Sequence, residues 1–160
     1  MKILIVSDSH GRTDNLEKVI DKTHPIDLLI HLGDIEGSED YIEAIAGCDT
    51  IMVSGNNDYF TSLDREKIIE VNGYKIYMTH GHMYQVNFGT GMIKAKGREL
   101  GAQIVMFGHT HRPLIDTVGD ITAINPGSIS LPRQEGHLPT YIIMEIDRFG
   151  KAHFTLNYLK

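Results

Sequence analysis

The amino-acid sequence predicts an α/β fold with mixed β-sheets. Five short apolar runs rich in isoleucine, valine and leucine have the composition of strands that are buried on both faces. Segments with helical periodicity separate several of these runs, which favours parallel strands in a layered arrangement. Hairpin-type turns dominate the second half of the chain, which favours antiparallel strands there. The five runs span residues 3–6, 28–32, 51–53, 76–78 and 104–107.

Three segments have the three- and four-residue apolar spacing of amphipathic helices. Ser38 is expected to cap the second helix at its N-terminus, and Gly47 is expected to end it. In the third helix, Gly97 is expected to weaken the helix, and the residues expected on one side are Met92, Ile93, Lys96 and Leu100. The three segments span residues 12–24, 38–47 and 90–102.

Three dipeptides mark the turns of the expected hairpins. Asn72-Gly73 lies between two alternating segments and is a strong signal for a two-residue hairpin. Gly119-Asp120 and Phe149-Gly150 lie between further alternating segments near the C-terminus. The expected sheets are therefore mixed, with parallel strands early in the chain and antiparallel hairpins late.

Length and charge limit the class of protein. A chain of 160 residues can form one well-buried domain but not two ordinary ones, so residues 1–160 are expected to form a single domain. The net charge of −6 disfavours a broad basic surface for long nucleic acid. Small phosphate esters are compatible with this charge, because bound divalent cations can reverse the local field. Assembly into a homo-oligomer is left open.

Cysteine content and the N-terminal segment indicate the compartment. Cys48 is the only cysteine, which excludes an intramolecular disulfide and a cysteine-based zinc cage, and we interpret it as a small packing residue. The N-terminal apolar run is too short for a signal-peptide core or a membrane span. We therefore expect a cytoplasmic protein with no membrane partner.

A cluster of polar residues follows each of the five apolar runs. In open α/β sheets, ligands bind at the carboxyl ends of strands, where neighbouring loops converge. Each residue alone has an ordinary explanation, since Asp34 could hold a turn and His82 could bond to its own loop. Their shared placement instead favours a metal site. The metal-competent side chains are Asp8, His10, Asp34, Asn56, Asn57, Asp58, His80, His82, His109 and His111.

The ligand types indicate which metals would bind. Oxygen and imidazole donors without thiolate suit Mn, Fe, Zn, Ni or Co rather than a soft metal. The carboxylates, amide and imidazoles together are too many for one ion and are about right for two ions that share a carboxylate. No activated serine or cysteine nucleophile and no H-E-x-x-H motif is present.

The motifs in order, D-x-H, G-D, G-N-x-D, H-G and G-H-x-H, resemble the signature of the calcineurin-like metallophosphoesterases. The resemblance spans roughly residues 3–128 and includes N-P-G-S at 125–128. It is strongest to the short prokaryotic phosphodiesterases of the YfcE type. That family has a four-layer α/β/β/α sandwich with two mixed β-sheets, which the resemblance implies for this chain.

The resemblance also implies a dinuclear centre that hydrolyses small phosphodiesters with a metal-activated water. Mn is the expected activator, with Ni, Zn, Fe, Co or Mg as alternatives. Carried over from the family pattern, one ion is held by Asp8, His10, Asp34 and His111, and the other by Asp34, Asn56, His80 and His109. The catalytic set implied is Asp34, Asn56, His80 and His82.

One position departs from the family pattern. Many members have a histidine after the asparagine of the third motif, and it is credited with contacting phosphate or protonating the leaving group. This chain has Asn57 there, so His82 could contact substrate instead. Arg112 and Arg133 could also touch phosphate, although arginines near turns are usually solvated. Asp58 is expected to orient the Asn56 loop by accepting backbone N–H bonds.

A second class of function is a non-catalytic protein scaffold of the same fold. A retromer subunit with this fold acts in that way and has an impaired metal site. The discriminating feature is completeness of the ligand set, and all seven expected positions carry competent residues here. Among the remaining histidines, His31 lies inside an expected strand and is interpreted as a hydrogen-bonded core imidazole.

Overall fold

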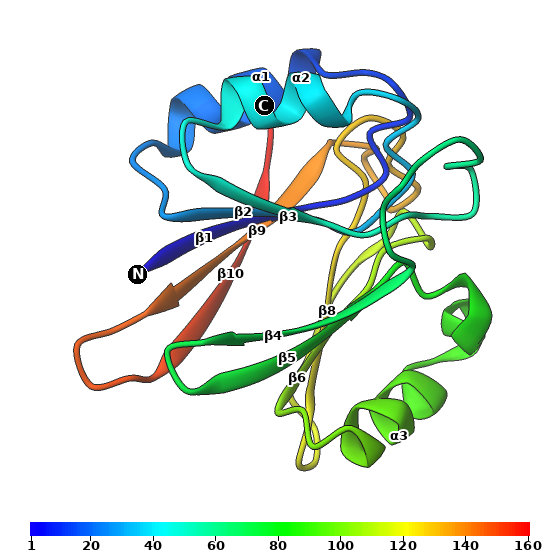
Figure 1. Ribbon diagram of the computed structural model, residues 1–160, viewed down its shortest axis with the longest axis vertical. Helices are drawn as coiled ribbons and strands as arrows, with labels where there is room; N and C mark the ends of the chain where they lie inside the picture. Colours follow the sequence, from blue (N-terminus) through cyan, green and yellow to red (C-terminus); the bar gives the residue numbers. More distant parts are fainter.

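Two five-stranded β-sheets lie face to face in a computed structural model that describes all 160 residues (Figure 1). In spatial order, the first sheet contains β10 (Ala152–Tyr158), β9 (Thr140–Ile146), β1 (Lys2–Val6), β2 (Leu28–His31) and β3 (Asp49–Met52). The second contains β4 (Glu66–Val71), β5 (Tyr74–Thr79), β6 (Ile104–Met106), β8 (Thr122–Pro126) and β7 (Pro113–Asp116).

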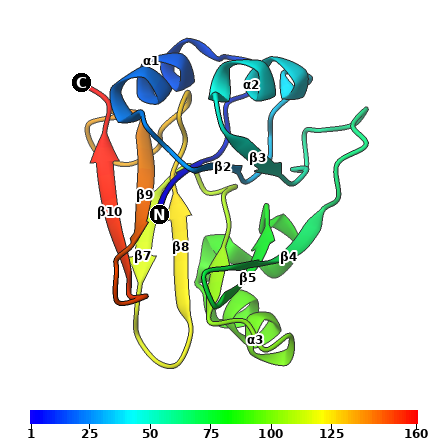
Figure 2. The ribbon, with the colours of Figure 1, turned by 60° about the vertical axis from the view of Figure 1, so that its left-hand side comes forward.

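Helices cover the outer face of each sheet. Figure 2 shows α1 (Asp14–Thr23) and α2 (Glu39–Ala46) on the first sheet and α3 (Gly91–Glu99) on the second. Two short 3₁₀ helices, η1 (His82–Tyr84) and η2 (Val86–Phe88), precede α3. The predicted four-layer α/β/β/α sandwich is confirmed. No helix combines the length and apolar character needed to cross a membrane.

Both sheets are mixed, as predicted. Strands β1, β2 and β3 run parallel to one another, as do β5, β6 and β8. Antiparallel pairs are formed by β9 with β1 and β10, by β4 with β5, and by β7 with β8. The Asn72–Gly73 hairpin joins β4 to β5, with Val71 opposite Tyr74. The two later hairpins also form at the expected turns.

Three apolar layers hold the sandwich together. Ile5, Met78 and Ile124 belong to the layer between the two sheets and are fully buried. A second layer, which includes Leu16, lies between the first sheet and helices α1 and α2. A third layer, which includes Ile93, lies between the second sheet and α3. Burying one such side chain stabilises the fold by about 1.5–3 kcal/mol, so these layers fix the relative positions of the strand ends.

The ends of α2 agree with prediction except for one contact. Ser38 occupies the N-cap position, but its side chain makes no capping hydrogen bond. Gly47 ends the helix in the left-handed conformation with φ of 64°, which glycine adopts without steric cost.

The packing of α3 corrects two expectations. Met92 is half exposed, so it does not belong to the apolar side, and the buried residues are Ile93 and Gly97. Gly97 was expected only to weaken the helix. A Cβ atom at this position would overlap the Cγ1 atom of Val105 in β6, so the glycine allows α3 to approach the sheet closely.

We predict that Gly97→Ala destabilises the protein although alanine is the better helix former. The helical preference favours alanine by about 1 kcal/mol, whereas overpacking against Val105 costs about 1–3 kcal/mol. Gly91→Ala is the matched control, because a Cβ there meets nothing within 4 Å. Urea unfolding should show a lower free energy of unfolding for Gly97→Ala alone. An increase in both variants would contradict the packing argument.

Candidate metal centre

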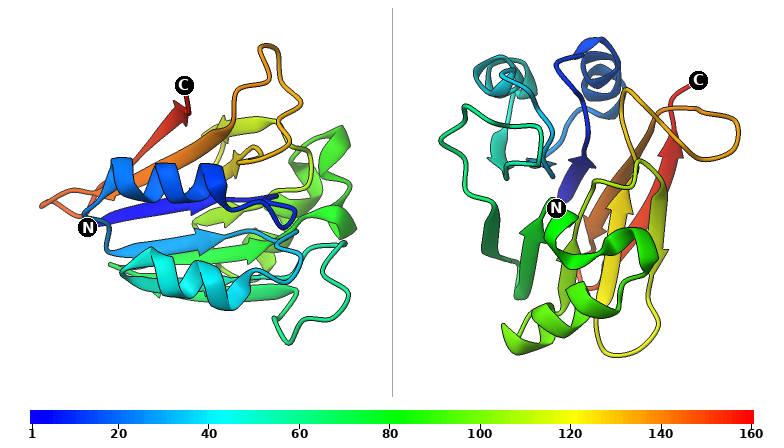
Figure 3. Two further views of the ribbon diagram at one scale, coloured as in Figure 1. Left: turned by 90° about the horizontal axis from the view of Figure 1, so that it is seen from above. Right: turned by 90° about the vertical axis from the view of Figure 1, so that its right-hand side faces the viewer.

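The loops that follow β1, β2, β5 and β6 converge at one end of the sandwich. Figure 3 shows, at left, the loop after β1 at the end of the strand opposite the N-terminus. Backbone hydrogen bonds join the loops there, from Asp8 N to Gly33 O at 3.0 Å and from Gly108 N to His80 O at 3.0 Å. Each of these two bonds links loops of one sheet. A third bond, from Ile129 N to Ser7 O at 3.1 Å, joins the loop after β8 in the second sheet to the loop after β1 in the first.

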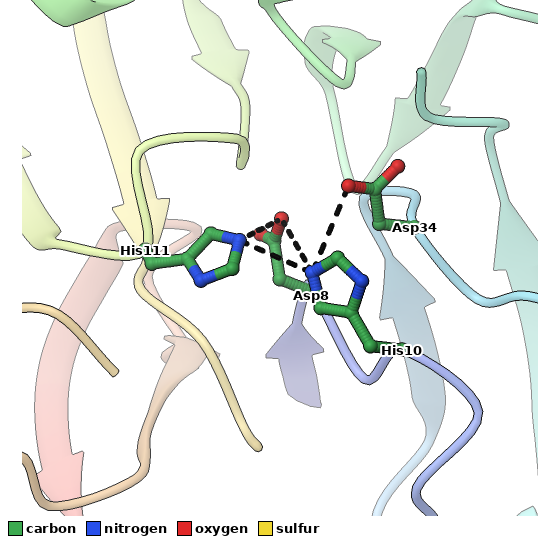
Figure 4. A group of neighbouring side chains, drawn as sticks. All are labelled: Asp8, His10, Asp34 and His111. Carbon is green, nitrogen blue, oxygen red and sulfur yellow. Dashed lines mark hydrogen bonds and ion pairs between the residues drawn. The ribbon is translucent and has the colours of Figure 1, made fainter. Parts of the chain in front are cut away.

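Four of the expected ligands form one compact group. Donor atoms of Asp8, His10, Asp34 and His111 all lie within 4.8 Å of one another. Figure 4 shows the rings of His10 and His111 directed at the Asp8 carboxylate, and the same ring nitrogen of His10 also faces Asp34. The Nε2 atom of His111 lies 3.1 Å from Asp8 Oδ1 and 3.1 Å from His10 Nε2.

The other expected residues extend this group on the side of His80. The Nε2 atom of His80 lies 3.4 Å from Asp34 Oδ2 and 3.8 Å from Asp8 Oδ1. The ring centroid of His109 lies 5.2 Å from that of His80, and the ring of His82 lies 6.1 Å from that of His109. Asp34 thus contacts histidines from both halves of the group.

Asn56 is the one expected ligand outside this contact network. It is exposed, and its side chain makes no hydrogen bond. The neighbouring Asn57 instead contacts the group, since its Nδ2 donates to Asp34 Oδ2 at 2.7 Å and its backbone N–H donates to Asp34 Oδ1 at 2.9 Å. Both oxygens of the Asp34 carboxylate are therefore held by residue 57.

The histidine tautomers point lone pairs at the carboxylates. Nδ1 of His80 lies 2.7 Å from the Leu32 carbonyl, and Nδ1 of His111 lies 2.7 Å from the Leu131 carbonyl. A carbonyl only accepts, so each Nδ1 carries the hydrogen and each neutral ring presents an Nε2 lone pair. Lone pairs facing carboxylate oxygens repel unless a proton or a cation lies between them.

Two buried atoms fit a bound cation. Asp8 Oδ1 and His80 Nε2 belong to side chains with no exposed surface, and neither has a hydrogen-bond partner. Buried polar groups are almost always satisfied, so such a pair needs a physical explanation. Oxygen and imidazole donors around a buried carboxylate are the donor set of a divalent metal site. The residues present therefore fit the metal that the sequence predicts.

Neighbouring charges shift the pKa values of Asp34 and His80 in opposite directions. Burial alone would raise the pKa of the Asp34 carboxyl. The His80 ring and the Asn57 donors lower this pKa by more than burial raises it, so it lies below its ordinary value. Burial acts to lower the pKa of His80, but Asp34 and Asp8 raise it above its ordinary value. The two carboxylates therefore favour a positive charge at the position of the His80 ring.

The sequence was compared with known families and structures. The family model of the calcineurin-like phosphoesterase superfamily domain matches residues 1–148. The chain belongs to this superfamily. A probable metallophosphoesterase of Methanocaldococcus jannaschii is 37% identical over 138 residues, which cover 83% of this chain and 70% of the relative. Phosphodiesterase YfcE of Escherichia coli is 26% identical over 171 residues, covering 92% of this chain and 89% of the relative.

Solved structures show the same architecture. A predicted phosphoesterase from Streptococcus pneumoniae superposes with a TM-score of 0.81 at 32% identity, over 99% of this chain and 88% of that one. A single mutant of Vps29 from Entamoeba histolytica superposes with a TM-score of 0.80 at 21% identity, over the whole of both chains. At that identity the likeness to Vps29 concerns the fold alone.

Five of the expected ligands of this phosphoesterase lie in the left-handed backbone region. Asp8, His10, Asp34, His109 and His111 have φ between 49° and 67°. This conformation costs a non-glycine residue about 1–2 kcal/mol and clusters at functional sites. It turns the chain sharply at the strand end, so side chains two residues apart reach the same centre. All five are Asp or His, which are among the non-glycine residues that adopt this conformation most often.

Glycines of the motifs allow the loops to approach the ligand carboxylates. A Cβ atom at Gly55 would overlap Oδ1 of Asp34, and one at Gly108 would overlap Oγ of Ser7 beside Asp8. The glycine of G-N and that of G-H-x-H are therefore needed for space rather than for an unusual φ.

Asp58 organises the loops that follow β2 and β3. Its carboxylate accepts backbone N–H bonds of 2.7–2.8 Å from Gly55 and from three residues of the Asp34 loop. The predicted role of Asp58 is confirmed. It holds the Asp34 turn against the Asn56 turn and does not face the histidines.

Sequence reasoning missed several residues that support the group. Asn125 donates to the Gly108 carbonyl at 2.8 Å, and Ser128 and Ser130 donate to the Asp8 carbonyl at 2.7 and 2.9 Å. The N-P-G-S motif was visible, but its role depends on contacts across the two sheets. Glu36 Oε1 lies 2.7 Å from His10 Nδ1, and no local pattern marked it.

His31 is a hydrogen-bonded core imidazole, as predicted. It is fully buried in β2 beneath the group, with Nε2 3.0 Å from Ser9 Oγ and Nδ1 accepting from Gly33 N–H at 3.3 Å. Both ring nitrogens are used by the neutral form. Burial lowers the pKa of His31 from 6.5 to about 4.

We predict that His31 makes the metal-free protein less stable in acid. Between pH 6.5 and 4 the unfolded chain binds a proton that the folded state excludes, so the free energy of unfolding falls by up to roughly 3 kcal/mol. His31→Gln should lose less stability over this interval, as measured by urea unfolding at both pH values. The exposed His24→Gln is the control. Equal losses in the wild type and His31→Gln would contradict the assignment.

Proposed function

We propose that residues 1–160 form a single metal-dependent phosphodiesterase domain with a dinuclear centre. The observation that carries this proposal is the pair of buried atoms without partners, Asp8 Oδ1 and His80 Nε2, in a group of carboxylates and imidazoles. Membership of the superfamily supports hydrolysis of phosphoric esters. The relative named phosphodiesterase YfcE supports small diesters as substrates.

The proposed ligands divide into two sets that share one carboxylate. The first ion would be held by Asp8, His10, Asp34 and His111, and the second by Asp34, Asn56, His80 and His109. The contacts of Asp34 with histidines on both sides support its bridging role. Divalent ions in such sites neutralise phosphoryl charge and lower the pKa of water, and we propose Mn as the activator.

The protein's own residues would keep these ligands in place. Asn57 holds both oxygens of Asp34, and Glu36 and the Leu131 carbonyl orient the rings of His10 and His111. Such partners fix ring orientation and the tautomer that binds metal. Nδ1 of His82 is buried without a hydrogen-bond partner beside His109. The rest of the His82 side chain is partly exposed, and we propose that it contacts the substrate.

The direct test is hydrolysis of bis(p-nitrophenyl) phosphate by the Mn-reconstituted protein. We expect activity that exceeds that on p-nitrophenyl phosphate and that disappears with a chelator and in His109→Ala. A non-catalytic scaffold is the alternative function, and the likeness of the fold to Vps29 is the observation that favours it. A fully loaded protein that hydrolyses neither ester would support the scaffold.

We predict that the chain binds two divalent ions and that Asp34→Ala lowers the occupancy of both. Asp8→Ala should mainly weaken one, because Asp8 is proposed as a ligand of one ion only. Elemental analysis after reconstitution and gel filtration measures the stoichiometry. Asp120→Ala, at an exposed ion pair with Arg98, is the control. Saturation of the wild type by a single ion would refute the dinuclear assignment.

We also predict that Asn57→His accelerates diesters with poor leaving groups. A carboxamide cannot supply a proton near neutral pH, whereas an imidazole can. General acid help is worth about 10²–10⁴ in rate and matters most for an alkoxide, since nitrophenolate departs unprotonated. The measurement compares kcat for a dinucleotide and for bis(p-nitrophenyl) phosphate at matched metal content. Equal changes for both would show that residue 57 does not face the leaving group.

A further inference from the structure

A cavity of about 410 Å³ lies beside the loop that carries His109 and His111. Its walls come from the segment before α3, from the G-H-T-H loop and from the segment after the N-P-G-S motif. Thr90, Thr110 and Asn125 supply neutral polar groups, and Arg112 and Arg133 are the only charged residues that line it. The volume is within the range of small-molecule sites.

The two arginines of this cavity have no partners. Arg98 and Lys94 pair with aspartates elsewhere on the surface, but the guanidinium groups of Arg112 and Arg133 make no ion pair and no hydrogen bond. Both residues are exposed. In a chain of net charge −6, two unpaired cations facing one cavity without any carboxylate form a local site for an anion.

The cavity shares one loop with the candidate metal centre. Thr110 lies between His109 and His111 in the chain, and Arg112 follows them. The backbone N–H of Arg133 donates to the His111 carbonyl at 3.0 Å. The side-chain Nδ2 of Asn125 donates a hydrogen bond to Thr110 Oγ1 at 3.0 Å. The loop that carries two of the proposed ligands therefore also forms part of the wall of this cavity.

The Asp34 side of the centre has the opposite charge. A cavity of about 500 Å³ there is lined by Glu36, Glu39 and Asp58, together with the exposed rings of Tyr59 and Phe60, and no cationic residue lines it. Asn57 connects this cavity to Asp34. A negative group on the substrate is repelled on this side and attracted by the arginines on the other.

We propose that the arginine cavity is a subsite for a second anionic group of the substrate. This rests on the proposed phosphodiesterase function and specifies its substrate class. The preferred diester carries a further phosphate or carboxylate on one arm, which the two guanidinium groups bind through charge-assisted hydrogen bonds. Water adds across one P–O bond of the diester to give a monoester and an alcohol, and the second anion does not react.

The test compares two dinucleotides that differ only in a terminal phosphate. Adenylyl-adenosine and its 5′-phosphorylated form are hydrolysed by the full chain loaded with Mn. We expect the KM of wild type to be about tenfold lower for the phosphorylated form, with similar kcat. In Arg112→Gln and Arg133→Gln this KM ratio should fall toward one. Arg148→Gln, in the exposed hairpin between β9 and β10, should keep the wild-type ratio.

Two results separate failure of the subsite from failure of the proposed function. A wild-type KM ratio near one, or a ratio that survives in both arginine variants, overturns the subsite while hydrolysis still stands. If neither dinucleotide nor bis(p-nitrophenyl) phosphate is hydrolysed, the phosphodiesterase proposal fails. In that case the subsite is tested by measuring the affinities of the two dinucleotides for the Mn-loaded protein by calorimetry. Tighter binding of the phosphorylated form supports the subsite, and equal affinities overturn it.

Discussion

The burial of two carboxylates beside three imidazoles is the constraint on which the functional end of this molecule depends. Asp8 is fully buried and Asp34 nearly so, and the histidine lone pairs that face them cannot be neutralised by the hydrogen bonds present. Isolated buried charge is among the most costly features of a folded protein. A divalent cation removes this cost, so the arrangement is understandable as a preformed metal site.

The fold supplies the rigidity that such a group requires. Three apolar layers fix the strand ends, and left-handed turns direct ligands from three loops to one place. Those turns are unfavourable by about 1–2 kcal/mol each, which burial of the surrounding core and metal binding would offset. Asp58, Ser128 of the N-P-G-S motif and Ser130 then join the loops to one another. Rigid placement, rather than a flexible loop, is expected of a site that is proposed to hold two ions.

Sequence reasoning reached the layers and the grouping of the ligands because both depend on local patterns. Apolar runs and hairpin dipeptides report burial and turning within a few residues, and polar clusters after strands report the binding edge. It failed where the cause is a contact between residues that are far apart in the chain. Gly97 is explained only by Val105 on another element, and Glu36 only by His10. The contact of Asn57 with Asp34, beside an exposed Asn56, likewise arises from tertiary geometry.

The most direct test of the account is to locate the metals in crystals of the Mn-loaded protein by anomalous scattering at the Mn edge. The account predicts two peaks about 3.5–4 Å apart, with Asp34 contacting both. Asp8, His10 and His111 should surround one peak, and His80 and His109 the other. A single peak, or two peaks that do not share Asp34, would contradict it.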